Sequence, residues 1–257
     1  MPHTDWNPDQ YERFRDERRQ PFFDLLALTR PRPAMRIVDL GCGTGELTRI
    51  LHDRLRASET VGLDNSAAML ERSGGFAGNG VRFEQADLAT FEPAQPYDLV
   101  FSNAALHWVP GHHDLLRRLT GFLRNGGQLA VQVPANHDHL SHLVAAAVAA
   151  EEPFRSALAG YVKQISVLAP ETYAALLEQL GYREQHVRLQ VYVHHLPARD
   201  DVVEWVKGTT LVDYQKRLPA ELYATFLERY RERLLPQLSD THPYCFPFKR
   251  ILFWGQR

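Results

Sequence analysis

The sequence has little cysteine and no excess of positive charge. Its 257 residues include only two cysteines, Cys42 and Cys245, in no pairing pattern, which favours a reducing compartment. The 29 lysines and arginines are balanced by 31 acidic residues, whereas nucleic-acid binding usually needs a basic surface. No apolar run is long enough to cross a membrane, and the charged N-terminus does not look like a signal peptide. We therefore expect a cytoplasmic protein that binds neither nucleic acid nor a membrane.

Hydrophobic residues make up 44% of the chain, enough for the core of one large domain or of a domain with a sizeable insertion. Apolar strands alternate with helices through the first half. The expected strands cover 35–40, 60–64, 81–87, 97–103 and 126–134, and the expected helices between them cover 46–55, 66–73 and 113–123. This alternation predicts an α/β fold with a parallel sheet and right-handed crossovers. One helix, or two short helices divided near Pro21, precedes the first strand.

The alternation of strands and helices stops after Pro134. Helical segments are expected at 136–154, 170–181, 200–211 and 219–235, with a sixth strand at 187–197 and a final strand at 248–255. We therefore expect two parts within one integrated domain. Residues 1–134 would form an α/β core that begins with a helix, and residues 135–257 would form a helical cover together with the last strands of the sheet.

The most informative stretch is VDLGCGTGELT, in which a strand, a glycine loop and a helix follow each other. Gly41, Gly43 and Gly45 allow a tight turn and a close approach of a ligand, at the strand end where doubly wound sheets bind nucleotides. A dinucleotide fingerprint needs a third glycine where this chain has Glu46. Glu46 and Asp39 would repel a pyrophosphate but accept an amine, which argues against an NAD-dependent oxidoreductase.

Acidic residues also follow the next two strands. Asp64 ends the second strand, where a carboxylate can bind the two hydroxyls of a ribose. Asp87 follows the third strand, where a carboxylate can accept a hydrogen bond from an adenine amino group. Together with the glycine loop, these acids fit a nucleoside that carries an amino acid better than they fit a pyrophosphate.

A histidine-rich segment, NAALHWVPGHHD, follows the fourth strand. Asn103 closes that strand at the ligand edge of the sheet, and His107 and Trp108 lie in the loop after it. A metal site built from His107, His112 and His113 is disfavoured because adjacent helical residues point in different directions, so we expect no metal. We expect His112 and His113 to be ordinary surface residues at the start of the next helix. His107 remains a candidate, either as a general base or as a wall of the pocket.

At these residues the sequence resembles the class I S-adenosyl-L-methionine (SAM)-dependent methyltransferases. The successive motifs of that superfamily are matched, in order and spacing, by VDLGCGTG, GLD, EQADL, YDLVFSNAALHWV and LRNGGQLAVQVP. A closer resemblance, to the trans-aconitate 2-methyltransferase family, is carried by WNPDQYERFRDERRQPFFDLLA, VEWVKGT and the terminal FPFKRILF. The resemblance implies a doubly wound, seven-stranded Rossmann-like sheet whose last strand inserts antiparallel. It also implies that the helical C-terminal cover lies over the active site.

The resemblance further implies SAM as the cofactor and S-adenosyl-L-homocysteine (SAH) as its product. The methionine part of SAM would lie along Gly41–Gly45, with Asp39 near its amino group. Asp64 would bind the ribose, and Asp87 with Leu88 would lie at the adenine. The complete set of expected cofactor-binding residues is Asp39, Gly41, Gly43, Gly45, Asp64, Asn65, Met69, Asp87, Leu88 and Asn103.

The family also implies an enzyme that methylates a carboxylate of a small, anionic, trans-aconitate-like acid to a methyl ester. A carboxylate is already ionised at neutral pH, so catalysis would be positioning, by His107 and Trp108, with water excluded. The N-terminal helix would close over the cofactor as a lid, or its arginines would be solvated. The expected acceptor-binding residues are Tyr11, Arg15, Arg18, His107, Trp108, His142 and Lys207, with Lys249 and Arg250 as further cationic candidates.

Two departures from the family concern the acceptor. The family has glutamine where His107 stands, and Leu-Arg-Pro where this chain has Leu211, Val212 and Asp213. An arginine lost and an aspartate gained should weaken the binding of a tricarboxylate. The alternatives are a methyltransferase for a hydroxyl or amine of another small metabolite, with His107 as the base, and a non-catalytic SAM-binding protein. The expected assembly is a monomer or a dimer.

Overall fold

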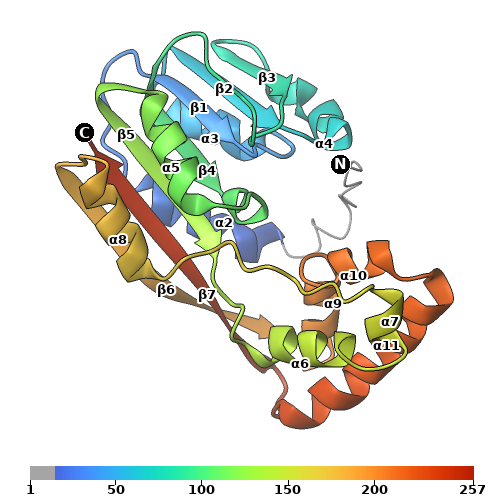
Figure 1. Ribbon diagram of the computed structural model, residues 1–257. Coiled ribbons are helices and arrows are strands. Elements are labelled where there is room, and N and C mark those ends of the chain that lie inside the picture. The colour runs from blue at the N-terminus through green and yellow to red at the C-terminus, as the bar shows by residue number, and fades with distance from the viewer. Residues whose placement is uncertain (1–14) are drawn as a thin grey trace.

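A seven-stranded sheet forms the centre of the protein (Figure 1). The computed structural model describes residues 15–257, with side chains from Arg19 onward. The strands are β1 (Arg36–Leu40), β2 (Glu59–Asp64), β3 (Val81–Gln85), β4 (Tyr97–Asn103), β5 (Leu123–Pro134), β6 (Glu184–Leu196) and β7 (Tyr244–Gln256). They lie in the order β3-β2-β1-β4-β5-β7-β6, with β7 antiparallel between β5 and β6. The predicted doubly wound sheet with an antiparallel last strand is confirmed.

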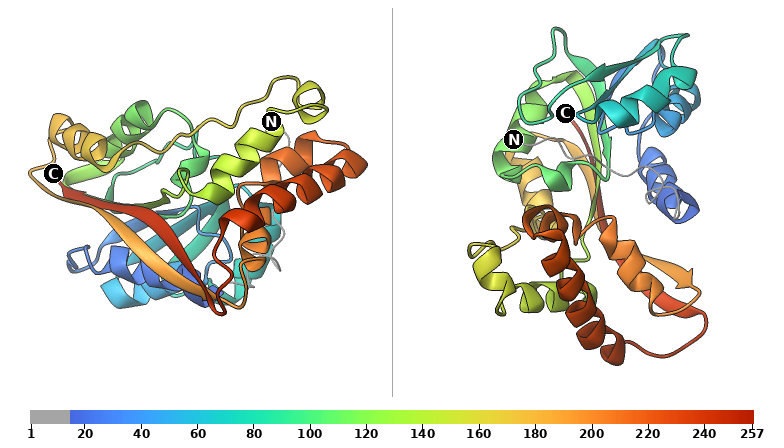
Figure 2. Two further views of the ribbon diagram at one scale, coloured as in Figure 1. Left: turned by 90° about the horizontal axis from the view of Figure 1, so that it is seen from below. Right: turned by 90° about the vertical axis from the view of Figure 1, so that its right-hand side faces the viewer.

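Helices occupy both faces of the sheet and form a further group beside it (Figures 1 and 2). They are α2 (Arg15–Leu26), α3 (Glu46–Leu55), α4 (Ala67–Glu71), α5 (His112–Gly121), α6 (Leu140–Ala149), α7 (Phe154–Ala157), α8 (Pro170–Gln179), α9 (Asp201–Lys207), α10 (Val212–Arg217) and α11 (Ala220–Leu234). The described residues also form the short 3-10 helices η1 (Arg72–Phe76), η2 (Leu106–Trp108) and η3 (Leu235–Gln237).

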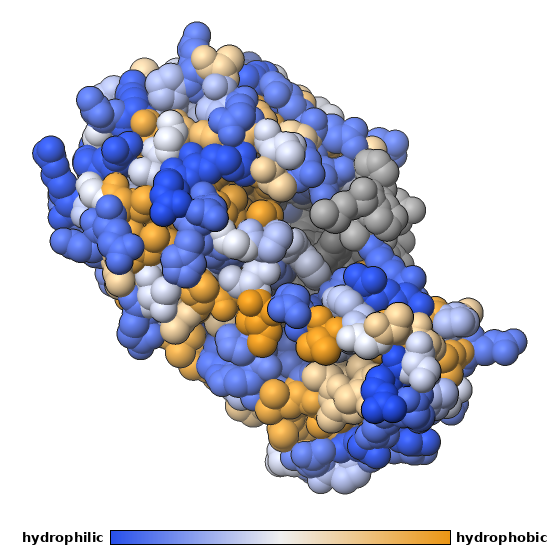
Figure 3. All heavy atoms as spheres, viewed as in Figure 1, coloured by the Kyte–Doolittle hydropathy of each residue, from blue (hydrophilic) through white to orange (hydrophobic). Residues whose placement is uncertain are grey.

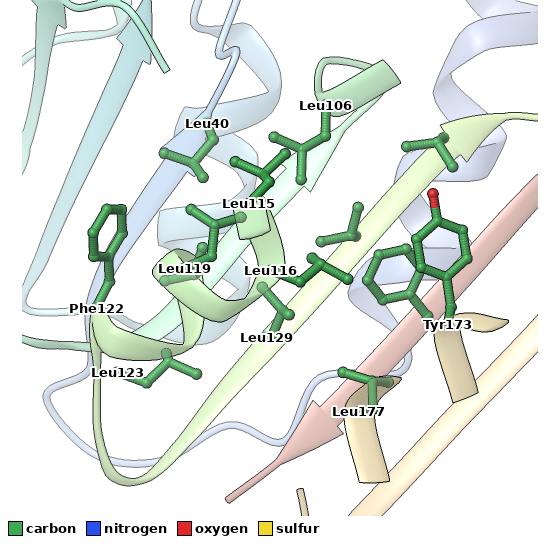
Figure 4. Packing of buried hydrophobic residues seen from close by; sticks show 14 of the residues in the cluster. Leu40, Leu106, Leu115, Leu116, Leu119, Phe122, Leu123, Leu129, Tyr173 and Leu177 are labelled. Atoms are coloured by element: carbon green, nitrogen blue, oxygen red, sulfur yellow. The ribbon is translucent and has the colours of Figure 1, made fainter. Parts of the chain in front are cut away.

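The central strands are apolar on both sides, as expected for parallel strands covered by helices. Along β1, Ile37 packs in the cluster with α2 and α3, whereas Val38 packs in the cluster with α5 and α8. Side chains of a strand alternate between its faces, so two neighbouring residues serve two separate layers. Figure 4 shows the second layer, with Leu116 of α5 facing Leu129 of β5 and Tyr173 of α8 beside them.

A second group of helices, α6, α7, α9, α10 and α11, packs around one apolar cluster and is called the cover below. Trp205, Phe226 and Tyr230 are buried in this cluster. β6 and β7 extend beyond the other strands toward these helices (Figure 1), and β7 contributes Phe246 and Phe248 to the cluster. The long β6–β7 ribbon therefore joins the cover to the core.

Some local features differ from the sequence prediction. Of the two alternatives for the N-terminal segment, the structure shows a helix, α2, that continues through Pro21. A proline in a helix costs about 3 kcal/mol, but burying Phe22 and Leu25 against the sheet offsets this, at about 1.5–3 kcal/mol for each side chain. Ser66 caps α4 as expected, since its hydroxyl accepts the Met69 N–H at 3.3 Å. β6 and β7 are longer than predicted because both reach into the cover.

Candidate active site

The carboxyl ends of β1, β2 and β4 meet at one edge of the sheet, and the loops that follow them form the candidate site. β1 pairs in parallel with β2 on one side and with β4 on the other. Ligands of such sheets bind outside these strand ends. The glycine loop after β1 therefore lies between Asp64, at the end of β2, and Asn103, at the end of β4.

The glycine loop is an open turn built from left-handed residues. Gly41, Gly43 and Gly45 have φ angles of 80, 56 and 81°, a region that favours glycine. The Gly41 N–H donates to the Leu63 carbonyl at 2.7 Å, which ties the loop to β2. A Cβ on Gly41 would lie 2.1 Å from the Cβ of Ala105, whereas one on Gly43 would meet nothing within 4 Å. The main chain at Gly43 thus borders space that a ligand can enter.

Asp64 is held by the loops on either side of it. Its two carboxylate oxygens accept the backbone N–H groups of Gly43 and Ser66, each at 2.9 Å. Burial raises the pKa of Asp64, and the backbone hydrogen bonds act in the opposite direction. Each carboxylate oxygen keeps capacity for another donor, so this side chain can also accept hydrogen bonds from two hydroxyl groups of a ligand.

Asp39 lies deeper, at 4% exposure, and accepts the Thr48 hydroxyl at 2.5 Å. Burial raises the pKa of Asp39 to about 7, against the hydrogen bond from Thr48, and the negative charge of Asp64 adds to the rise. A positively charged ligand would stabilise the ionised forms of this pair of carboxyl groups. A cofactor that carries an ammonium and a sulfonium group therefore fits the residues present.

The remaining cofactor candidates lie along the same edge at different depths. Leu88 is half-buried, and its Cδ1 would lie 4.0 Å from a Cβ on Gly41. Asp87 is exposed and accepts a backbone N–H at 2.9 Å. Met69 is buried in α4, and Asn65 is exposed just before that helix. Leu88 thus borders the glycine loop, while Asp87 and Asn65 lie at the rim.

The loop after β4 carries two buried polar atoms that have no hydrogen-bond partner among the described residues. They are Oδ1 of Asn103 and Nδ1 of His107. The ring of His107 lies 4.6 Å from the ring of Trp108, which is 40% exposed. An unpaired buried polar atom costs about 1–3 kcal/mol. Both atoms therefore suit a site in which a ligand supplies the partner.

His107 is a neutral imidazole at neutral pH. Burial, together with the positive charges of Lys163 and Arg250, lowers its pKa to about 3. A group with so low a pKa is a weak base near pH 7. It can still donate or accept a hydrogen bond, and this favours positioning over proton transfer.

The prediction that His112 is a surface residue is wrong. Its ring is 3% exposed, with Nδ1 2.5 Å from the Tyr173 hydroxyl oxygen and Nε2 3.0 Å from the Leu106 carbonyl oxygen. α8, distant in the sequence, brings Tyr173 over the start of α5 and buries the ring. By holding Leu106, His112 positions the turn that carries His107. His113 is exposed, as expected.

On the cover side, the acceptor candidate His142 lies in α6. Burial lowers the pKa of His142 to about 3, and the charge of Lys163 is the next cause. The charge of Lys163 also contributes to the lowered pKa of His107. Lys207 pairs instead with Glu204 of its own helix at 2.9 Å, and its expected acceptor contact stays a prediction.

Two cations act on His107: Arg250, which the sequence analysis names as a candidate, and Lys163, which it does not. Nζ of Lys163 lies 5.4 Å from the ring centroid of Trp108 and 2.8 Å from a carboxylate oxygen of Asp213. Nothing in the sequence singles out Lys163, which lies in the irregular segment between α7 and α8. Arg250 is 4% exposed and lies over the ring of Phe248 at 4.8 Å.

The expected lid residues Tyr11, Arg15 and Arg18 lie outside the residues whose side chains are described, so the lid stays a prediction. Within the described part of the chain, no group of three His, Cys, Asp or Glu residues could hold a metal ion. No helix there is long and apolar enough to span a membrane.

Comparisons with known proteins identify the family. A family model described as a methyltransferase domain matches residues 11–187. The chain belongs to this methyltransferase family. A trans-aconitate 2-methyltransferase of Deinococcus radiodurans is 45% identical over 98% of each chain. Another of Streptomyces avermitilis is 41% identical over 96% of this chain and 94% of the relative.

Solved structures share the fold. The YcgJ protein of Bacillus subtilis has a TM-score of 0.61 at 16% identity and covers 93% of this chain and 98% of its own. A phosphoethanolamine N-methyltransferase of Haemonchus contortus, solved with SAH, has a TM-score of 0.56 at 15% identity over 93% of this chain and 53% of that one. At these identities the likeness shows the fold alone. The family match and the two relatives above confirm the prediction of a SAM-dependent methyltransferase.

Proposed function

We propose that this methyltransferase converts a carboxylate of a small organic acid into its methyl ester, with trans-aconitate or a related acid as the acceptor. The relatives at 45% and 41% identity are trans-aconitate 2-methyltransferases. The observation that carries the proposal is Lys163, whose charge acts on both His107 and His142. Lys163 lies 5.4 Å from the ring centroid of Trp108, next to His107 in the chain, and a cation at this place suits a carboxylate, which accepts hydrogen bonds from an ammonium group and from neutral imidazoles.

For the cofactor, we propose that the methionine part of SAM lies along Gly41–Gly45, with its amino group near Asp39 and its ribose on Asp64. The open space at Gly43 and the two neighbouring carboxyl groups support this arrangement. When bound, SAM supplies a methyl group attached to a positively charged sulfur. Further cofactor contacts are proposed at Asn65, Met69, Asp87, Leu88 and Asn103.

The acceptor carboxylate needs no base, because its ordinary pKa of about 4 leaves it ionised near pH 7. Its oxygen bonds to the methyl carbon as the carbon–sulfur bond breaks and the electron pair stays on sulfur, which yields the methyl ester and SAH. The chain holds the oxygen in line and keeps water out. His107 and Trp108 would form the wall behind the acceptor, and the helical cover would shield it.

A hydroxyl or amine acceptor, the alternative, needs a group that removes a proton. His107 is a poor choice because its pKa is lowered to about 3. The carboxylate therefore remains the better acceptor for this site. We also propose that the acceptor is anionic. We further propose that the enzyme acts in the cytoplasm, and its two free cysteines, Cys42 and Cys245, agree with that reducing compartment.

The test is a methyl-transfer screen with purified protein, SAM and a panel of small carboxylic acids, with hydroxyl and amine compounds alongside. We expect a product that gains one methyl group by mass and loses it in mild alkali, as an ester does. Transfer only to hydroxyl or amine compounds would contradict the proposal. His107→Gln should stay active, because glutamine also donates and accepts hydrogen bonds; complete loss of turnover would instead make His107 a base.

A further inference from the structure

The segment 158–169, between α7 and α8, runs along the boundary between core and cover (Figure 1). Apolar side chains reach the surface near this boundary (Figure 3), and within the segment Val162 and Ile165 are 69% and 60% exposed. Lys163 is less exposed than these apolar neighbours, since only 28% of its side chain is accessible to solvent. A lysine that is more buried than its apolar neighbours needs polar partners, and Lys163 has them on both sides of the boundary.

Lys163 joins the core to the cover through three contacts. Its Nζ lies 5.4 Å from the ring centroid of Trp108 in the core. In the cover it donates to the Thr210 carbonyl at 3.3 Å and pairs with Asp213 at 2.8 Å. Asp213 is 26% exposed, and an ion pair this sheltered is screened less than one on the open surface. Asp213 therefore holds the ammonium group beside Trp108.

The polar groups around Lys163 include both charged and neutral side chains. His107 and His142 are kept neutral, first by burial and then by the charge of Lys163 itself. Arg250 is a second buried cation whose charge reaches His107. Asp213 opposes these cations, so it sets how much positive charge an anionic acceptor experiences.

We propose that Lys163 binds a carboxylate of the methyl acceptor, and that Asp213, through its ion pair with Lys163, limits the negative charge that the acceptor site accepts. This inference rests on the proposed function and names the residues that select the acceptor. An acid with one carboxylate shares Lys163 with Asp213. Each further carboxylate on the acceptor is repelled by Asp213 in surroundings less polar than water. Asp213 therefore shifts the preference of the enzyme from tricarboxylates such as trans-aconitate toward related acids of lower charge.

Three variants separate these roles. Lys163→Gln removes the cation and raises KM for every carboxylate by about tenfold, and Lys163→Arg restores most of the loss. Asp213→Asn frees Lys163 and lowers KM for a tricarboxylate by about threefold more than for a monocarboxylate. Asp114→Asn is the matched control, because it removes an exposed acid that pairs only with the surface residue Arg117 on α5. It should leave the order of preference among the acids unchanged.

The experiment measures kcat and KM for crotonate, mesaconate and trans-aconitate, which carry one, two and three carboxylates. Calorimetry on the protein saturated with SAH measures the binding of the same acids without turnover. The SAH titration also checks that each variant keeps its cofactor site. The expected result is a preference that shifts toward trans-aconitate in Asp213→Asn alone.

The possible outcomes distinguish a failure of this inference from a failure of the proposed function. Equal changes for all three acids in Asp213→Asn overturn the inference while leaving carboxylate methylation intact. A loss in Lys163→Gln that falls on kcat alone, with acid binding unchanged, also overturns it, because Lys163 would then not bind the carboxylate of the acceptor. If the unaltered protein neither binds nor methylates any of the three acids, the proposed function fails and the inference fails with it.

Discussion

Replacing Asp39 with asparagine should stabilise the cofactor-free protein at pH 8 and weaken its binding of SAM. Asp39 is 4% exposed, and its pKa is raised from 3.8 to about 7, chiefly by burial. The folded state therefore disfavours the ionised carboxylate relative to the unfolded chain. Its contribution to stability is fully present below pH 3.8 and is lost as the pH rises toward about 7.

The magnitude follows from the pKa change, at about 1.4 kcal/mol for each pKa unit. Ionising Asp39 in the folded protein should lower the free energy of unfolding by about 4 kcal/mol at most. Asparagine does not ionise, and its carbonyl oxygen can still accept the Thr48 hydroxyl. The advantage of Asp39→Asn over the unaltered protein should therefore grow by about 2–3 kcal/mol between pH 5 and pH 8. Under the proposed binding mode, the same change removes a negative charge that would attract the ammonium group of the cofactor.

Urea unfolding at pH 5 and pH 8 measures these free energies, and calorimetry with SAH measures the affinity. Asp98→Asn is the matched control, because Asp98 is 2% exposed but accepts the Arg36 N–H at 2.8 Å and pairs with Arg124. Its loss of charge should destabilise the protein at both pH values. A stability of Asp39→Asn equal to that of the unaltered protein at pH 8 would refute the reasoning.

Three further changes test other parts of the structure. Gly41→Ala should lower both stability and SAH affinity, since its φ is +80° and a Cβ would meet another at 2.1 Å; Gly74→Ala, with open space around it, is the control, and equal losses would contradict the argument. His112→Phe should destabilise the protein by about 2–4 kcal/mol in urea and lower kcat, because it releases the turn that carries His107. Trp205→Ala should cost about 3–5 kcal/mol and shift a single unfolding transition, whereas two transitions would show that the cover unfolds separately from the core.

The strands and turns of the parallel half of the fold are predictable because short segments of the sequence determine them. Each central strand is a continuous apolar run, as residues such as Val38 and Leu40 require when both faces are buried. Gly41 and Gly43 mark the turn because few other residues adopt left-handed backbone at low cost. Ser66 marks the start of α4 because its hydroxyl accepts a backbone N–H of the first turn.

The acceptor side is less predictable because it depends on contacts between distant segments. His112 follows a glycine at the start of an amphipathic helix, and only Tyr173, 61 residues away, makes it a buried residue. Lys163 lies in a segment without regular periodicity, and its position is set by Trp108 and Asp213. Interactions of this kind leave no repeating pattern of apolar residues, so they become visible only when the segments are packed together.

The two sides of the proposed site carry opposite charges. This difference would fix how the two substrates of the proposed reaction are oriented. Asp39 and Asp64 make the glycine-loop side attractive to a cation, whereas Lys163 and Arg250 make the opposite side attractive to an anion. A sulfonium and a carboxylate would then bind in one orientation only. As the methyl group moves, the positive charge on sulfur and the negative charge on oxygen cancel, so the transition state is less polar than the bound reactants. Excluding water from such a site favours the transition state. A neutral His107 agrees with this, because an imidazolium in its place would stabilise the separated carboxylate and slow the transfer.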